Sequence, residues 1–147
     1  MEPSVKIDGI RLWLVLHKAY KAVEQAARDH LDSLDLCLTD FAVMEALMHK
    51  GPMRVNELGD KVILTSGSIT TAVQRLEKIG YLKRKTSPED GRVQVISLNA
   101  TGRKFIARHF REHERVLEEA TDVLNAKERI QLERLLKKWG RSLQPEE

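Results

Sequence analysis

The sequence predicts a mainly helical fold with a small β-hairpin (α+β), in which a winged helix-turn-helix lies between N- and C-terminal helices. Apolar residues recur at helical spacing in the first and last thirds of the chain, and two short helical segments separated by a turn occupy the middle. Two β-prone runs joined by a turn that contains Pro and Gly follow them. The 147 residues, 41% of them hydrophobic, suffice for one domain, 1–147, with a buried core.

The first helix is expected over residues 7–31. Its apolar residues recur every three or four positions: Ile10, Trp13, Leu14, His17, Tyr20, Val23 and Ala27. Residues 12–16 are apolar all round, which a helix packed on one side does not require. We therefore expect this helix to be covered on two sides, either by a surrounding core or by a second subunit.

The middle of the chain, residues 39–98, predicts the winged part. Thr39 is the expected N-cap of a helix that ends at Lys50, before Gly51-Pro52. A shorter helix is expected over 56–62, and a turn over 63–65. Ser66 or a neighbour then caps a further helix, which ends near Ile79 with Gly80 as its C-terminal stop.

The β-hairpin is expected from strands 81–86 and 93–98, joined by a turn over 87–92. Asn99 is the expected N-cap of a long helix through Leu124. Asn125, with Glu128 three residues later, forms the sequence pattern of a capping box for the final helix.

The helix over 66–79 divides into two faces on a helical wheel. Apolar side chains fall in one sector and are expected in the core: Ile69, Ala72, Val73, Leu76 and Ile79. Short polar side chains fill the opposite arc near the N-terminus, and longer hydrogen-bond donors follow them. A helix that enters the major groove of DNA with its N-terminal end needs this arrangement.

The charge of the chain is concentrated in this region. The formal net charge is +3, and residues 66–92 carry six basic against three acidic side chains, so the other 120 residues sum to zero. Such a patch indicates a surface that faces a polyanion. We expect Arg92 at the hairpin tip to enter a minor groove, and Asp90 to pair with Arg92 and hold it extended. The candidate residues for binding double-stranded DNA are Ser66, Ser68, Thr70, Thr71, Gln74, Arg75, Lys78, Arg84, Lys85 and Arg92.

Each of these features also has a structural interpretation. Ser, Thr and Gln are common on solvated helix faces, and consecutive cations often protect an exposed strand edge from aggregation. The order of helix, turn, helix and basic hairpin favours DNA binding over these alternatives.

Five segments of the chain together resemble the MarR family of bacterial transcription regulators. They are Asn56-Glu57-Leu58-Gly59, Ser66-Gly67-Ser68-Ile69-Thr70, the run from Arg75 to Leu82, Ser87-Pro88-Glu89-Asp90-Gly91-Arg92, and Leu98-Asn99-Ala100-Thr101-Gly102. The fourth is similar to the wing signature of the family, which usually begins with Asp where this chain has Ser87.

The resemblance implies an obligate homodimer. Helices 7–31 and 100–143 would pair, and two copies of the winged part, 39–98, would bind a pseudo-palindromic operator. It also implies repression relieved by a small phenolic or quinone-like effector or by a stress signal such as thiol oxidation.

Three groups of residues have a possible further role. Cys37 is the only cysteine, which excludes an intrachain disulfide. No basic residue adjoins it in sequence to stabilise a thiolate, whereas Asp35 and Asp40 disfavour one, so a small buried apolar role is favoured over redox sensing. Trp13, His17 and Tyr20 are expected in the core or, alternatively, in a pocket for an aromatic ligand.

His109 and His113 lie four residues apart, a spacing that binds metals, but a hydrogen-bonded histidine at the dimer interface is favoured. We expect no metal and no other cofactor. The alternative function is a winged helix that binds proteins without reading DNA, which would place apolar patches on the polar helix face.

The sequence shows no nucleophile with a base partner, no paired carboxylates and no glycine-rich phosphate loop, and we expect no enzyme. It also shows no signal-peptide pattern and no apolar run of the roughly 20 residues that cross a membrane. We therefore expect a cytoplasmic protein.

Overall fold

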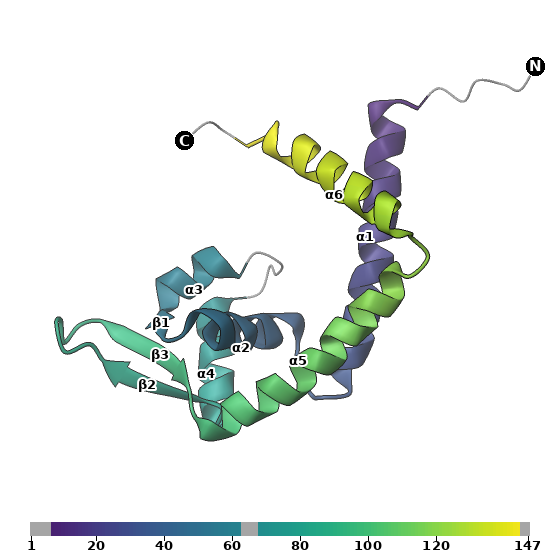
Figure 1. The fold of residues 1–147 in the computed structure, drawn as a ribbon. Coiled ribbons are helices and arrows are strands. Elements are labelled where there is room, and N and C mark those ends of the chain that lie inside the picture. The colour runs from purple at the N-terminus through teal and green to yellow at the C-terminus, as the bar shows by residue number, and fades with distance from the viewer. Residues whose placement is uncertain (1–6, 63–67, 145–147) are drawn as a thin grey trace, which may run out of the picture.

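The structure is a computed structural model that describes residues 7–62 and 68–144. Helices dominate it, with one small antiparallel sheet, which confirms the predicted fold class (Figure 1). The elements in chain order are α1 (Gly9–Asp32), α2 (Leu38–Lys50), β1 (Met53–Arg54), α3 (Val55–Lys61), α4 (Ile69–Ile79), β2 (Leu82–Thr86), β3 (Gln94–Leu98), α5 (Ala100–Thr121) and α6 (Ala126–Arg141).

Most helix ends follow from local capping chemistry. Ser68 caps α4 by accepting a hydrogen bond from the backbone N–H of Thr71 at 3.3 Å, and Gly80 ends it with a left-handed φ of 92°. Asn99 and Asn125 cap α5 and α6 as predicted.

The predicted N-cap of α2 is wrong. The helix begins two residues earlier, with Cys37 as its N-cap and Thr39 buried in its first turn. The side chain of Asp40 accepts a hydrogen bond from the Cys37 backbone N–H at 3.3 Å, and this bond sets the start of the helix.

The sheet has the strand order β1-β3-β2, and both pairs are antiparallel. β2 and β3 form the predicted hairpin, in which Leu82 lies opposite Leu98 and Thr86 opposite Gln94. β1 was not predicted, because a strand of two residues is too short to show an alternating pattern.

A core of apolar side chains holds the winged part together. Its innermost members come from five different elements and are each at most 2% exposed: Leu47, Leu58, Leu76, Ile96 and Ile106. Burying a side chain of this size stabilises the fold by roughly 1.5–3 kcal/mol. Ala72 and Val73 of α4 join this core, but Ile79 is 48% exposed, so the prediction that it is buried is wrong.

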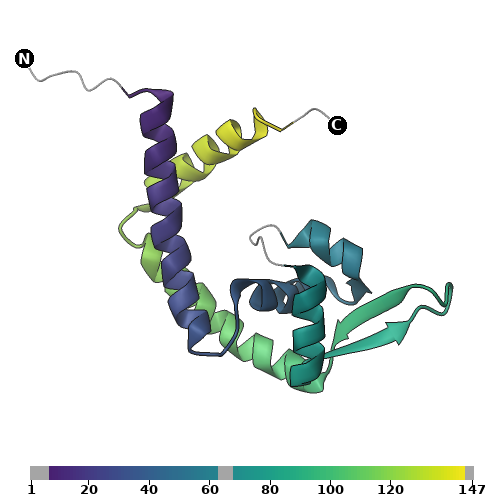
Figure 2. The ribbon, with the colours of Figure 1, turned by 180° about the vertical axis from the view of Figure 1, so that it is seen from behind.

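Two segments project beyond this core, the N-terminal half of α1 and all of α6, which we call the arms (Figures 1 and 2). α1 buries only Ala27 and Leu31, and α6 has no buried residue within the part of the chain that the structure describes. Trp13 is 57% exposed, so the expectation that residues 13, 17 and 20 belong to the core of the chain is wrong. The apolar side chains of the arms are left without cover in the single chain.

Candidate nucleic-acid interface

α4 presents an exposed polar face opposite its buried one, as the helical wheel predicts. Ala72, Val73 and Leu76 point into the core. The exposed side chains at its N-terminal cap and along its outer face are Ser68, Thr70, Thr71, Gln74 and Lys78. Ser66 lies outside the described residues. The N-terminal half of this face carries only short side chains, so a bound partner could approach the helix backbone closely.

Arg75 differs from its neighbours on α4, because its guanidinium turns back to α2. Its Nε lies 3.1 and 3.0 Å from the two carboxylate oxygens of Asp40, and its Nη2 lies 2.5 Å from Asp40 Oδ1. Hydrogen bonding to this carboxylate raises the pKa of Arg75 above its ordinary value. Nη2 also donates to Cys37 Sγ at 3.2 Å. The predicted reading residue is thus engaged within the protein, although its side chain stays 43% exposed.

The first strand of the wing is tied to α4 by a second bidentate pair. Arg84 donates from Nε to Glu77 Oε1 at 3.1 Å and from Nη2 to Glu77 Oε2 at 2.9 Å. Hydrogen bonding to Glu77 raises the pKa of Arg84. Lys83 and Lys85 of the same strand are exposed. The wing therefore presents cations along β2, while Arg84 also fixes the angle between wing and helix.

The wing tip is shaped by hydrogen bonds to backbone amides. Asp90 Oδ1 accepts from the backbone N–H of Arg92 at 2.9 Å, so the predicted pairing with the Arg92 side chain is wrong. Ser87 Oγ accepts from the Glu89 N–H at 3.3 Å, a turn contact that aspartate also makes and that serine makes more weakly. These bonds order the turn and leave Arg92 exposed at its end.

Three segments meet where α4 ends, the wing begins and α5 starts. Asn99 donates from Nδ2 to the Gly80 carbonyl oxygen at 2.7 Å and accepts from the Gly102 N–H at 2.8 Å. A Cβ at Gly102 would lie 2.1 Å from the backbone oxygen of Tyr81, so only glycine fits there. The sequence placed Gly102 in a motif, but it did not predict the contact between Gly102 and the Tyr81 backbone. No pattern of neighbouring residues indicates such a contact.

Cys37 lies on the surface, so the predicted buried role is wrong. Its basic neighbour is Arg75, which is far away in sequence and was therefore missed.

The aromatic side chains expected in a ligand pocket lie on the exposed part of α1. Trp13 and His17 stack with ring centroids 5.6 Å apart, and the Tyr20 hydroxyl donates to Glu24 at 3.2 Å. The structure brings these three residues together along one helix, without enclosing them.

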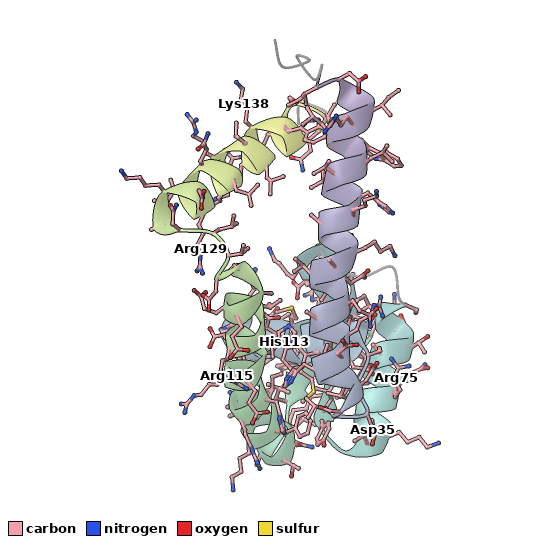
Figure 3. All side chains as sticks on the ribbon, turned by 90° about the vertical axis from the view of Figure 1, so that its right-hand side faces the viewer. Asp35, Arg75, His113, Arg115, Arg129 and Lys138 are labelled. Carbon is pink, nitrogen blue, oxygen red and sulfur yellow. The ribbon has the colours of Figure 1, made fainter. Side chains whose placement is uncertain are left out.

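His113 is buried inside the chain, between α1 and α5 (Figure 3). Its ring lies 4.6 Å from that of Phe41 and 5.5 Å from that of His30, between ring centroids. Burial, with the nearby His30, lowers its pKa. The expectation of a hydrogen-bonded histidine is wrong here, because among the described residues its Nδ1 has no hydrogen-bond partner.

The other histidine of that pair, His109, contacts Glu112 at 3.1 Å instead of sharing a site with His113. Residues 7–62 and 68–144 contain no cluster of three side chains that could hold a metal ion.

A helix, a connection, a second helix with a polar outer face and a basic two-stranded wing define a winged helix-turn-helix protein. The MarR family model matches residues 36–93, which contain α2, both helices of the helix-turn-helix and the first strand and turn of the wing. The transcriptional regulator MhqR of Bacillus subtilis is 35% identical over 132 residues, which are 90% of this chain and 91% of that protein. The chain belongs to the MarR family, and it is a DNA-binding transcription regulator of that family.

Two solved structures of the same fold hold DNA. A mutant MarR of E. coli in complex with operator DNA is 25% identical to this chain, with a TM-score of 0.78 over 88% of this chain and 93% of that one. Sco3205 of Streptomyces coelicolor in complex with DNA has a TM-score of 0.82 at 21% identity, over 99% of this chain and 94% of that one. None of the helices within the described ranges is long and apolar enough to span a lipid bilayer.

Proposed function

We propose that the chain is a homodimeric repressor that binds a pseudo-palindromic operator in a sequence-specific way. The observation that carries this proposal is the exposed polar face of α4, which stands beside a wing whose cations are exposed. A protein-interaction surface would show apolar side chains there. Short hydroxyl side chains with Gln74 behind them are the groups that a major groove accommodates and that recognise base edges.

The described residues divide into base-reading and phosphate-binding groups. Thr71 and Gln74 face outward from the first two turns of α4 and are assigned to base edges. Lys78 and Lys85 are exposed cations further from the helix N-terminus and are assigned to phosphates. Arg92 at the end of the wing is assigned to the adjacent minor groove, where a long cation meets the most negative potential.

The arms support the dimer. Large apolar side chains are 37–72% exposed along α1 and α6, a density that a single soluble chain does not ordinarily leave in water. Pairing the arms of two chains would bury these side chains and hold two winged parts at a fixed separation. A two-fold symmetric dimer requires two half-sites in inverted orientation.

An effector is proposed to act at the arms. Trp13, His17 and Tyr20 present aromatic rings in the first half of α1, where a partner chain would close over them. Rings of this kind bind flat aromatic molecules by stacking. A small phenolic or quinone-like compound bound there would change the separation of the two winged parts and release the operator.

Selection of duplexes from a random library by the wild-type protein tests the proposal. We expect one pseudo-palindromic duplex to be enriched and its affinity to fall steeply with salt. Gln74→Ala and Arg92→Ala should each cost about 1–3 kcal/mol on that duplex, and Gln74→Ala should leave a scrambled duplex unaffected. Lys78→Ala is the matched control, which should weaken both duplexes equally. Enrichment of no duplex, or a flat salt response, would contradict DNA reading and favour a protein-binding module.

A further inference from the structure

The carboxylate of Asp40 is a buried charge near the start of α2. The residue is 1% exposed, and it lies three positions after the N-cap of that helix. A buried carboxylate is tolerated only when it is paired and hydrogen-bonded. The backbone N–H of Cys37 supplies one bond, but this local bond leaves the charge without a counterion.

The counterion comes from the reading helix. Arg75 of α4 approaches Asp40 from 35 residues further along the chain, with both Nε and Nη2 within 3.1 Å of carboxylate oxygens. A planar guanidinium that engages a carboxylate with two nitrogens fixes orientation as well as distance. The pair therefore defines how α4 is rotated about its own axis relative to α2.

The other contacts of α4 do not set its rotation relative to α2 in this way, since Glu77 pairs with Arg84 of the wing and not with α2. Ala72, Val73 and Leu76 bury apolar surface, and apolar contact has no preferred direction. Gly80 and Asn99 hold the C-terminal end of the helix, beyond its reading face. Gln74 directly precedes Arg75 on α4, so a rotation of the helix that displaces Arg75 also changes the direction in which Gln74 projects.

We propose that Arg75 is a positioning residue for DNA reading: its pairing with Asp40 orients α4 so that Thr71 and Gln74 face the bases. This inference rests on the proposed function. It differs from a phosphate contact by Arg75, because Arg75 acts on DNA through the carboxylate of α2 and the rotation of its helix. Asp40, which is buried, thereby becomes a determinant of sequence preference.

Asp40→Asn and Arg75→Gln are the test variants, with the duplex that wild-type protein enriches and a scrambled duplex of the same composition as probes. We expect each variant to lose about tenfold in affinity for the enriched duplex and nothing on the scrambled one. The double variant should lose no more affinity than either single variant, because each single substitution already removes the whole Asp40–Arg75 interaction. The dependence of affinity on salt should stay that of the wild type, because no phosphate contact is lost.

Arg75→Lys separates positioning from phosphate contact. Lysine is an effective point charge for a phosphate but lacks the planar fork, so the positioning role predicts that the loss persists. Circular dichroism and urea unfolding establish that each variant is folded, and if Arg75→Gln does not fold, Arg75→Lys and Asp40→Asn carry the test. Lys78→Gln is the matched control on the same helix, and it should weaken binding to both duplexes and lower the salt dependence.

Three results would overturn the inference. Normal affinity of folded Asp40→Asn would show that the pair does not orient the reading face. Full recovery with Arg75→Lys, together with a reduced salt dependence in Arg75→Gln, would assign Arg75 to a phosphate. Failure of the wild-type protein to enrich any duplex would refute the proposed function as well, whereas the first two results leave that function standing.

Discussion

The winged part and the arms are built on opposite principles. The winged part closes its own core, with Leu47, Leu58 and Ile96 almost wholly buried. In the arms, large apolar residues such as Trp13 and Leu136 remain at least 40% exposed. The winged part thus owes its shape to contacts within one chain, whereas the apolar side chains of the arms would be covered only in the proposed dimer.

The largest effect is expected from substitutions that disrupt pairing of the arms and leave the winged part folded. Leu132→Asp with Leu136→Asp places two charges four residues apart on the apolar side of α6. We expect a monomer by sedimentation velocity, and a loss of roughly 100- to 10,000-fold in affinity for the enriched duplex, because the two winged parts are no longer linked. Gln131→Asp adds a charge at a neighbouring polar position and should remain dimeric. A dimer in the double variant would remove the arms from the interface.

A core substitution has the complementary effect. Leu47→Ala should lower the free energy of unfolding by about 2–5 kcal/mol, because it removes a side chain that is 2% exposed and leaves a cavity. Urea unfolding measures this loss. Leu132→Ala is the same change in an arm. It should weaken the association of two chains and leave the free energy of unfolding of the winged part unchanged. Equal effects of both on unfolding of the isolated chain would contradict the division into two parts.

Substitutions at two glycines test how tightly α4, the wing and α5 pack where they meet. Gly102→Ala should cost about 1–3 kcal/mol by overpacking, since its Cβ would meet the Tyr81 backbone oxygen at 2.1 Å. Gly59→Ala is the matched control in α3, where a Cβ meets nothing within 4 Å, and it should stabilise the protein slightly. Thermal unfolding of the two variants should therefore shift in opposite directions, and a shared direction would contradict the close approach.

The smallest effect is expected at the buried His113, where α1, α2 and α5 meet. Burial lowers its pKa in the folded chain, so the unfolded chain takes up this proton first as the pH falls. The stability contributed by neutral His113 is present above pH about 6.5 and is lost as the pH falls below it. The groups that face it are Phe41 of α2 and His30 of α1.

Urea midpoints at pH 7.5 and 5.5 measure this dependence. The wild-type midpoint should fall more between these pH values than that of His113→Phe. The exposed His49, changed to Phe, is the control and should behave as the wild type. An unchanged pH dependence in His113→Phe would assign the effect to other groups.

The sequence predicted most of the fold because the signals for it are local. Caps such as Asn99, the left-handed stop at Gly80 and the period of apolar residues each involve neighbours within a few positions. It could not predict contacts that depend on how elements pack. The partners Asp40 and Arg75 are 35 residues apart, and the surface position of Cys37 follows from where α2 begins. The exposed face of α4 was therefore predictable, and the orientation of one arginine on it was not.

Sedimentation equilibrium of the protein with the enriched duplex tests most directly whether paired arms place two winged parts on one DNA molecule. The free protein should have twice the 16.8 kDa mass of the chain, and the complex should contain two chains for each duplex. A complex with one chain per duplex, formed from a protein that is monomeric in solution, would contradict the paired arrangement.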